Sequence, residues 1–307
     1  MTNVQFLVTT APVGAQPRPV IGVDGPVVGA DACYDHHATQ EPVNLEAIPA
    51  AVGVPGTIVT TMLDTDAVIS AAVVLLRADG AEEAVERCWP TLYEAAHVCD
   101  HLVPSGRYPD AERAGLGLHC WLKEKGFALG EVLAWSRGEL ANDPSPGVHA
   151  VPSPETKSAV FRHLTLAVVT AVRRGTLPCD FAYLDRLAGM EARARRAVRV
   201  TRGWVTLLEP EGFVDPLALY RAVETDVAVV MNRLPEGAFK YSLGVHPRAY
   251  SRINLEPVFH TLGTREPGWG GRKNAGGSPL NGGSRIPPDE LVSLVNAALG
   301  AAQGSRQ

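Results

Sequence analysis

The chain has 307 residues, of which 46% are hydrophobic and 20% are charged, and its formal net charge at pH 7 is −5. This length favours two domains of ordinary size, and the composition excludes a disordered or fibrous chain. Because no stretch concentrates lysine and arginine, long nucleic acid is not expected as a partner.

Short apolar stretches alternate with Gly, Pro and Asp turns in the first part of the chain. Residues 19–23, 27–29 and 57–62 have the continuous apolar character of buried parallel strands, and residues 67–77 follow as a helix. Helical patterns come next at 82–102, 111–125 and 128–137. This alternation predicts an α/β domain with a mainly parallel sheet and surrounding helices.

The second half of the chain begins with a different composition. Residues 142–153 are rich in Pro, Ser and Gly and predict an exposed connector. Residues 155–174 and 182–200 then place apolar side chains at helical spacing. From residue 203 onward strands and turns prevail, and a last helix is expected at 288–302. We therefore predict one domain over residues 1–202 and a smaller α/β domain over residues 203–307.

The sequence carries no recognisable signal for export or for insertion into a membrane. The first residues lack a basic segment followed by a long apolar one, and the longest apolar run, residues 67–76, is too short for a bilayer of about 30 Å. The five cysteines form no C-x-x-C pair, which argues against structural zinc. We expect a cytoplasmic protein without a membrane partner, and a homodimer is left open.

Aspartate and histidine residues gather near the ends of the first predicted strands. Carboxylate and imidazole together suit Mn²⁺, Fe²⁺ or Zn²⁺, and ligand sites of open α/β folds lie at the carboxyl ends of strands. A strand that ends in D-x-D before a helix puts both carboxylates at that edge. The candidate metal ligands are Asp24, Asp31, Asp35, His36, Asp64, Asp66 and Asp100.

Each of these residues also has a purely structural interpretation. Asp24-Gly25-Pro26 is typical of a turn, Asp64 of a helix cap, and His101 of a half-buried histidine. Their coincidence in the first third of the chain favours a metal site over three unrelated structural roles.

A glycine-rich segment at residues 269–278 (WGGRKNAGGS) is the second candidate site. Its glycines would let backbone N–H groups approach an anion closely, and Arg272, Lys273 and Ser278 would add charge and hydrogen bonds. A flexible turn without a ligand explains the same glycines. The candidate substrate-binding residues are Gly270, Gly271, Arg272, Lys273, Asn274, Gly276, Gly277, Ser278 and His246.

Two parts of the sequence resemble the DHH phosphoesterase superfamily. Asp35-His36-His37 is similar to the signature triplet of that family, and residues 64–76 (DTDAVISAAVVLL) are similar to its opening motif. Residues 239–299 look like the DHH-associated C-terminal domain, in which a glycine-rich loop precedes a closing helix. The motif order departs from the family, in which the D-x-D motif comes first. The loop also carries Arg272 where the family has histidine.

The resemblance implies a hydrolase of a small phosphorylated molecule that uses one or two divalent ions, most simply Mn²⁺, to activate water for in-line attack. Asp35, His37 and Arg272 would be the catalytic residues, with His37 contacting or protonating the leaving oxygen. Arg272 would bind a more anionic group than histidine does, through a bidentate contact.

The altered motif order leaves the assignment of the aspartates open. In a permuted arrangement Asp24 or Asp31 supplies the aspartate of the second motif, and Asp100 supplies the fourth. Two alternative functions are a diverged metalloenzyme with a non-phosphate substrate and a non-catalytic binding protein.

Overall fold

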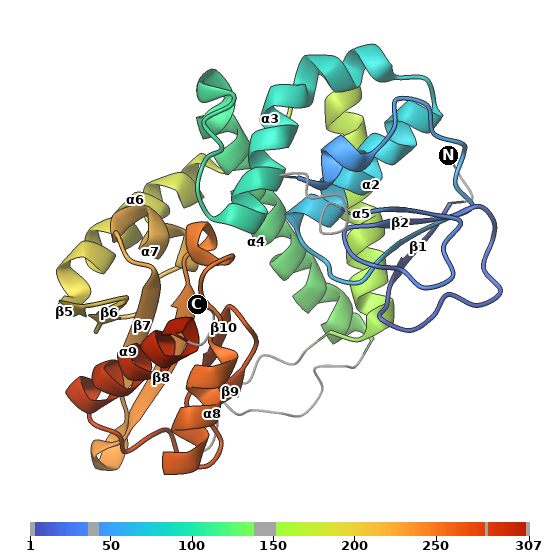
Figure 1. Cartoon of the computed structure of the whole chain (residues 1–307). Helices are drawn as coiled ribbons and strands as arrows, with labels where there is room; N and C mark the ends of the chain where they lie inside the picture. Colours follow the sequence, from blue (N-terminus) through green and yellow to red (C-terminus); the bar gives the residue numbers. More distant parts are fainter. Residues whose placement is uncertain (1–3, 36–42, 138–151, 280–281, 305–307) are drawn as a thin grey trace. The chain divides into compact units, whose positions relative to one another are not determined.

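The computed structural model describes residues 4–35, 43–137, 152–279 and 282–304 (Figure 1). It is a mixed α/β protein with a four-stranded parallel sheet and a six-stranded mixed sheet, which confirms the predicted class. The chain divides into two compact units: Met1–Asp100 with Pro104–Leu184, and His101–Val103 with Asp185–Gln307. Within the described ranges no helix is both long and apolar enough to cross a membrane.

The first unit is built on the parallel sheet. Its strands are β1 (Gln5–Val8), β2 (Val20–Val23), β3 (Ala32–Tyr34) and β4 (Thr57–Thr60), in the order β1-β4-β2-β3. The central strands β2 and β4 are buried throughout. In the register of the sheet Val23 lies opposite Tyr34. Asp24 and Asp35, which follow these residues, therefore leave the sheet at the same edge.

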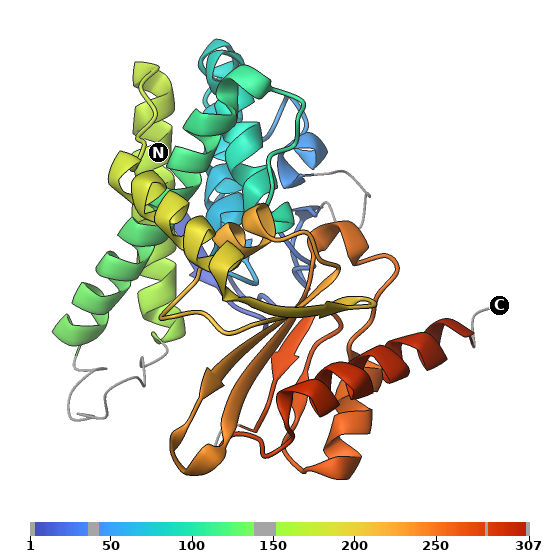
Figure 2. The ribbon, with the colours of Figure 1, turned by 90° about the vertical axis from the view of Figure 1, so that its left-hand side faces the viewer.

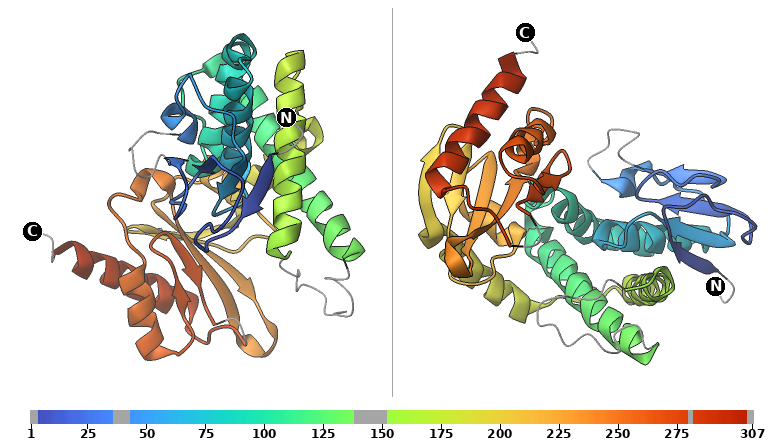
Figure 3. Two further views of the ribbon diagram at one scale, coloured as in Figure 1. Left: turned by 90° about the vertical axis from the view of Figure 1, so that its right-hand side faces the viewer. Right: turned by 90° about the horizontal axis from the view of Figure 1, so that it is seen from below.

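Helices pack on this sheet and on one another. Helix α2 (Thr65–Ala78) is buried from Thr65 to Leu76, which explains its unbroken apolar sequence. Helices α4 (Glu112–Ser136) and α5 (Pro154–Arg174) lie beside it (Figure 3). The ring of Phe6 in β1 meets that of Phe161 in α5 edge to face, with centroids 5.5 Å apart. Helix α3 (Glu82–His101) and the short helices η1 (Asn44–Ala47) and η2 (Pro109–Ala111) complete the unit.

Several predicted elements of this unit differ from the structure. Residues 27–29 are not a strand: they precede β3, which begins at Ala32, and β1 was not predicted. The helices expected at 111–125 and 128–137 are one helix, α4. Gly126 did not break it because a glycine there permits close packing: a Cβ would lie 3.3 Å from Cδ1 of Leu164 in α5. The expected connector lies outside the described residues except for its last two positions.

The second unit contains the mixed sheet. Its strands are β5 (Val198–Arg202), β6 (Val205–Leu208), β7 (Val227–Arg233), β8 (Phe239–Val245), β9 (Gly270–Gly271) and β10 (Ala275–Gly277), in the order β5-β6-β7-β8-β10-β9. Strands β6 and β7 pair in parallel and the other pairs are antiparallel. Two short helices, η3 (Pro235–Gly237) and η4 (Pro247–Ala249), flank β8.

The two faces of this sheet are covered differently. Val229 and Leu243 belong to the main core, which is closed by α8 (Glu256–Arg265) and α9 (Pro288–Gly304). Ala228 belongs to a smaller cluster with residues of α6 (Phe181–Ala197) and α7 (Pro216–Ala222). Figure 2 shows α8 and α9 on one side of the sheet. The alternation of side chains along each strand produces this division.

Helix α6 explains why the two units divide between Leu184 and Asp185 and not near residue 202. Ala194 and Ala197 of α6 pack with Leu208 and Leu219 of the second unit. The helical spacing of residues 182–200 indicates an apolar face but does not identify the sheet that the face covers.

The glycine-rich segment is a β-hairpin in which Gly276 pairs with Gly271 and Gly277 with Gly270. The N–H of Arg272 donates to the carbonyl of Ala275 (2.7 Å) and closes the turn. A Cβ at Gly271 or Gly276 would overlap the ring of Phe259 in α8. These two glycines are therefore required for packing, whatever else the hairpin does.

We predict that Gly276→Ala lowers the free energy of unfolding by about 1–3 kcal/mol, because the added methyl group must displace Phe259 or the facing strand. Gly263→Ala in α8 is the matched control, since nothing lies within 4 Å of a Cβ there. Alanine at position 263 should be neutral or slightly stabilising. Urea unfolding of both variants measures the difference, and equal stability would contradict the packing role.

Candidate functional site

Two aspartates mark the carboxyl edge of the parallel sheet in the first unit. Asp24 directly follows β2 and Asp35 directly follows β3, and both are buried. The N–H of Asp24 donates to the carbonyl of Tyr34 (3.1 Å), which links the two strand ends. Asp24 has φ +53°, a left-handed conformation that aspartate adopts more readily than most residues. The hydroxyl of Thr61 donates to its carbonyl (3.4 Å).

Two more aspartates enter from the start of α2. Asp64 is the N-cap of this helix, and its Oδ1 accepts from the N–H of Ala67 (2.9 Å). Asp66 lies in the first turn and is fully buried. One of its oxygens accepts from the hydroxyl of Ser70 (3.2 Å) and the other from the N–H of Asn44 (3.4 Å). The positive end of the helix dipole favours both carboxylates at this position.

These carboxyl groups lie close together in two pairs. Asp24 is within hydrogen-bonding reach of Asp64. Asp66 is within reach of Asp100, which lies near the end of α3. A hydrogen bond within either pair requires that one of its two carboxyl groups carry a proton. The edge of the sheet therefore brings four carboxyl groups together, with Asp35 near the first pair.

Burial raises the pKa of each paired carboxyl group, and the neighbouring carboxylates raise it further. Burial and then the charge of Asp24 raise the pKa of Asp64 to about 7. Burial and then the charge of Asp66 raise the pKa of both Asp24 and Asp100. For Asp66 the causes are burial and then Asp64, and its hydrogen bonds act in the opposite direction. The cluster thus opposes the loss of its last protons.

The chemistry of this set of donors fits a divalent cation. Buried carboxylates that raise one another's pKa are relieved by a positive ion, and oxygen donors are typical ligands of Mn²⁺ and Mg²⁺. Over the ranges that the structure describes, no group of three or more His, Cys, Asp or Glu side chains has the arrangement of metal ligands. The carboxyl groups lie there in the two pairs described above. His36 and His37 fall outside the described residues.

The structure corrects the prediction for Asp31. This residue precedes β3, so it lies at the amino edge of the sheet and not with Asp24 and Asp35. Its carboxylate is bonded to the guanidinium of Arg18 (2.6 Å) and to the N–H of Val20 (2.6 Å). The hydrogen bond from Arg18 is the main reason why the pKa of Asp31 lies below its usual value. Asp31 therefore has a structural role.

The aspartate cluster also contains residues that the sequence analysis did not select. Asn44 and Ser70 hold Asp66, and Cys99 is adjacent to the acids. Burial, followed by the charges of Asp64 and Asp100, raises the pKa of the Cys99 thiol. Ser70 could have been found, because it lies four residues after Asp66 on the same face of a helix. Asn44 donates through its backbone N–H, so its residue type does not indicate that it contacts Asp66.

The candidate substrate residues of the second unit lie in three kinds of surroundings. Ser278 and His246 are buried and have structural partners: Ser278 Oγ accepts from the N–H of Tyr241 (3.0 Å), and His246 Nδ1 accepts from that of Arg248 (3.1 Å). Burial lowers the pKa of His246, as does the nearby charge of Arg248. Arg272 and Lys273 are exposed at the tip of the hairpin. Asn274 and Gly276 line a cavity of this unit.

Comparison with models of known protein families gave no match to this chain, and no curated protein is significantly similar to it.

We predict that Asp64→Asn stabilises the chelator-treated protein at pH 7.5, whereas Asp64→Ala destabilises it. Asparagine removes the charge, and its side-chain oxygen can still accept the hydrogen bond from the N–H of Ala67. Alanine removes this N-cap, and its loss costs about 0.5–2 kcal/mol. Thermal unfolding followed by circular dichroism in EDTA gives the order of the three proteins. If asparagine destabilises as much as alanine, the proposed carboxylate repulsion is wrong.

The raised pKa of Asp64 also predicts how the stability of the metal-free protein depends on pH. The unfolded chain ionises Asp64 near 3.8, but the folded protein holds the proton until about pH 7. In that window a rise in pH releases protons from the unfolded state first, so the stability of the fold falls. Without metal, the melting temperature should therefore drop more between pH 5 and 7 for the native sequence than for Asp64→Asn.

Proposed function

We propose that this protein is a metal-dependent hydrolase of a small phosphorylated molecule, of the kind found in the DHH phosphoesterase superfamily. The observation that carries the proposal is the gathering of buried aspartates at the carboxyl edge of the parallel sheet. Asp24, Asp35 and Asp64 converge there from three separate segments of the chain. Ligand sites of open α/β folds lie at this edge.

In this proposal Asp24, Asp35, Asp64 and Asp66 hold one or two Mn²⁺ ions together with His36. Such ions supply a Lewis acid that lowers the pKa of a bound water and neutralises charge on phosphate. The protein supplies orientation: Ser70 and the N–H of Asn44 fix both oxygens of Asp66, and the N–H of Ala67 fixes Asp64. Asp100 pairs with Asp66 next to this proposed site.

The roles of three further residues rest on the resemblance alone. Asp35 begins the D-H-H triplet, and His37 is proposed to contact or protonate the leaving oxygen. Arg272 is proposed to bind an anionic group of the substrate. Its exposed position on the hairpin leaves the guanidinium accessible to a ligand.

We predict that Asp35→Asn removes metal binding and phosphate release together while the fold is retained. Loss of a ligand should weaken the affinity for Mn²⁺ by at least about 10- to 100-fold, the range already seen when partners of ligands are changed. The matched control is Asp31→Asn, which changes an aspartate at the opposite edge of the same sheet. Metal content by mass spectrometry and phosphate release from a panel of nucleotides and sugar phosphates measure both effects.

Each result bears on a different part of the proposal. Full metal content and turnover in Asp35→Asn would refute this site. Bound metal without phosphate release from any compound would favour a metalloenzyme with a non-phosphate substrate. No bound metal in the native protein would favour a binding protein, in which the aspartates serve only the fold.

We further predict that Arg272→Ala weakens substrate binding by about 1.5–3 kcal/mol, because charge-assisted hydrogen bonds to an anion are stronger than neutral ones. The change should appear in KM and leave the metal content unaltered. Arg265→Ala is the control, since Arg265 is an exposed arginine of α8 that pairs with Glu290 (3.1 Å). An unchanged KM for Arg272→Ala would exclude this contact.

A further inference from the structure

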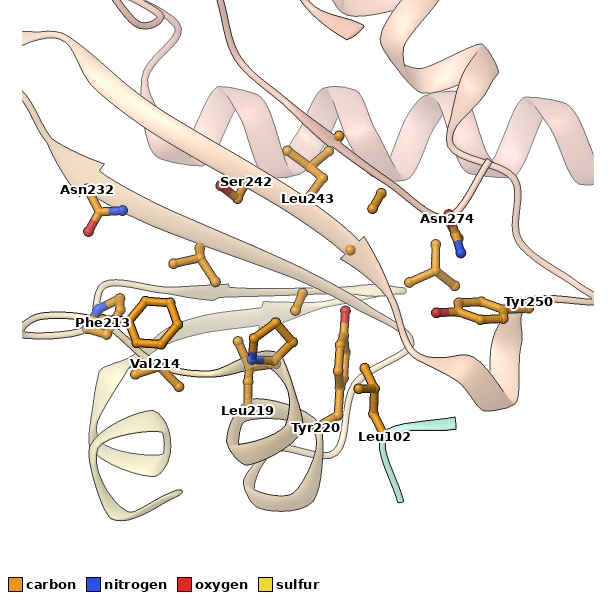
Figure 4. A pocket seen from close by; sticks show the side chains of 18 of the residues that line it. Leu102, Phe213, Val214, Leu219, Tyr220, Asn232, Ser242, Leu243, Tyr250 and Asn274 are labelled. Atoms are coloured by element: carbon orange, nitrogen blue, oxygen red, sulfur yellow. The ribbon is translucent and has the colours of Figure 1, made fainter. Parts of the chain in front are cut away.

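The second unit contains a cavity of about 680 Å³ on the face of the mixed sheet that α8 and α9 do not cover (Figure 4). This volume is in the range of small-molecule sites, which is about 300–1,000 Å³. All the residues that line it belong to the second unit. The cavity is therefore formed within one unit by strands, a helix and loops.

Small residues at matching positions of neighbouring strands make the floor of the cavity. Ala228 of β7 and Ser242 and Gly244 of β8 face it, while their neighbours along each strand face the main core. A Cβ at Gly244 would lie 2.6 Å from the hydroxyl oxygen of Tyr220. Glycine at this position thus makes room for the hydroxyl of Tyr220 against the floor of the cavity.

Aromatic side chains form the wall opposite this floor. Tyr220 of α7 is held in place by the ring of His246, with centroids 5.0 Å apart. Tyr250 points into the cavity beside Asn274 (Figure 4). Phe213 stands at the mouth and is 70% exposed although it is large and apolar. Its ring therefore adds apolar surface beside the cavity.

The polar groups of the cavity are uncharged. Asn232, Ser242 and Asn274 supply amide and hydroxyl groups, and none of the described lining residues is Lys, Arg, His, Asp or Glu. A carboxamide offers a donor and an acceptor side by side. An ionic group would lose its hydration here without gaining a partner of opposite charge. The lining therefore selects against anions, unlike the hairpin tip with Arg272 and Lys273.

We propose that this cavity binds an uncharged aromatic ring compound that carries an amide-like pair of hydrogen-bond donor and acceptor. The ring would stack against Tyr220 and Phe213, and its polar edge would pair with Asn274 or Asn232. The proposal uses no property of the aspartate cluster, so it holds whether or not the protein is a hydrolase.

Three probes of similar size test the class of ligand on the full chain: benzamide, benzoate and cyclohexanecarboxamide. Saturation-transfer NMR and titration should show that benzamide binds in the millimolar range. Benzoate should bind more weakly because its charge finds no partner in the cavity. Cyclohexanecarboxamide should bind about three- to tenfold more weakly, since it lacks the aromatic contacts.

Two variants locate the binding of benzamide. Ser242→Leu places a larger side chain on the floor and should weaken binding at least about tenfold by filling the cavity. Phe213→Ala should weaken it about three- to tenfold. Phe181→Ala is the matched control, because Phe181 is another exposed phenylalanine, at 59%, and does not line the cavity. Circular dichroism establishes that each variant is folded.

The proposal is supported if benzamide binds best of the three probes and only the two cavity variants weaken it. It is overturned if the native protein binds no benzamide, or if folded Ser242→Leu binds benzamide as well as the native protein. Equal or tighter binding of benzoate would exclude an uncharged ligand. Equal binding of cyclohexanecarboxamide would exclude the aromatic part.

Discussion

The mutual repulsion of buried carboxylates is the constraint on which the first unit depends. Helix α2 is buried over almost its whole length, so Asp64 and Asp66 at its start cannot move away from the sheet. Asp24 and Asp35 are fixed by the ends of β2 and β3. A fold that needed only stability would not gather these charges, because apolar residues of similar size pack there without the cost of burying charge. A bound cation, as proposed above, would offset this cost.

The edge of the sheet to which an aspartate belongs could be predicted from the sequence for Asp24 but not for Asp31. Asp24 follows an apolar run that is a strand, so its place at the carboxyl edge was predictable. Asp31 follows residues 27–29, which are equally apolar but form a turn, and it precedes the real strand β3. A strand displaced by a few residues moves an aspartate from one edge of the sheet to the other. Apolar character alone does not resolve this difference.

The glycines of the second unit show a related limit of prediction from the sequence. Gly271 and Gly276 suggested an anion-binding loop, yet their lack of a side chain is required by Phe259 of α8. Gly244 makes room for the hydroxyl of Tyr220, a role that its own sequence neighbourhood does not reveal. In both cases the meaning of a glycine depends on a residue of another element that faces it. The local sequence shows that a glycine allows unusual backbone conformations. It does not show which side chain of another element leaves no room for a Cβ there.

The two candidate sites differ in the kind of group that each can select. In the proposed function the aspartate cluster would hold a cation and, through it, favour an anion such as phosphate. The cavity of the second unit offers rings and amides but no charge, so it discriminates among uncharged groups. The two selectivities rest on separate residues, so ligands that lack charge and ligands that lack an aromatic ring test them independently.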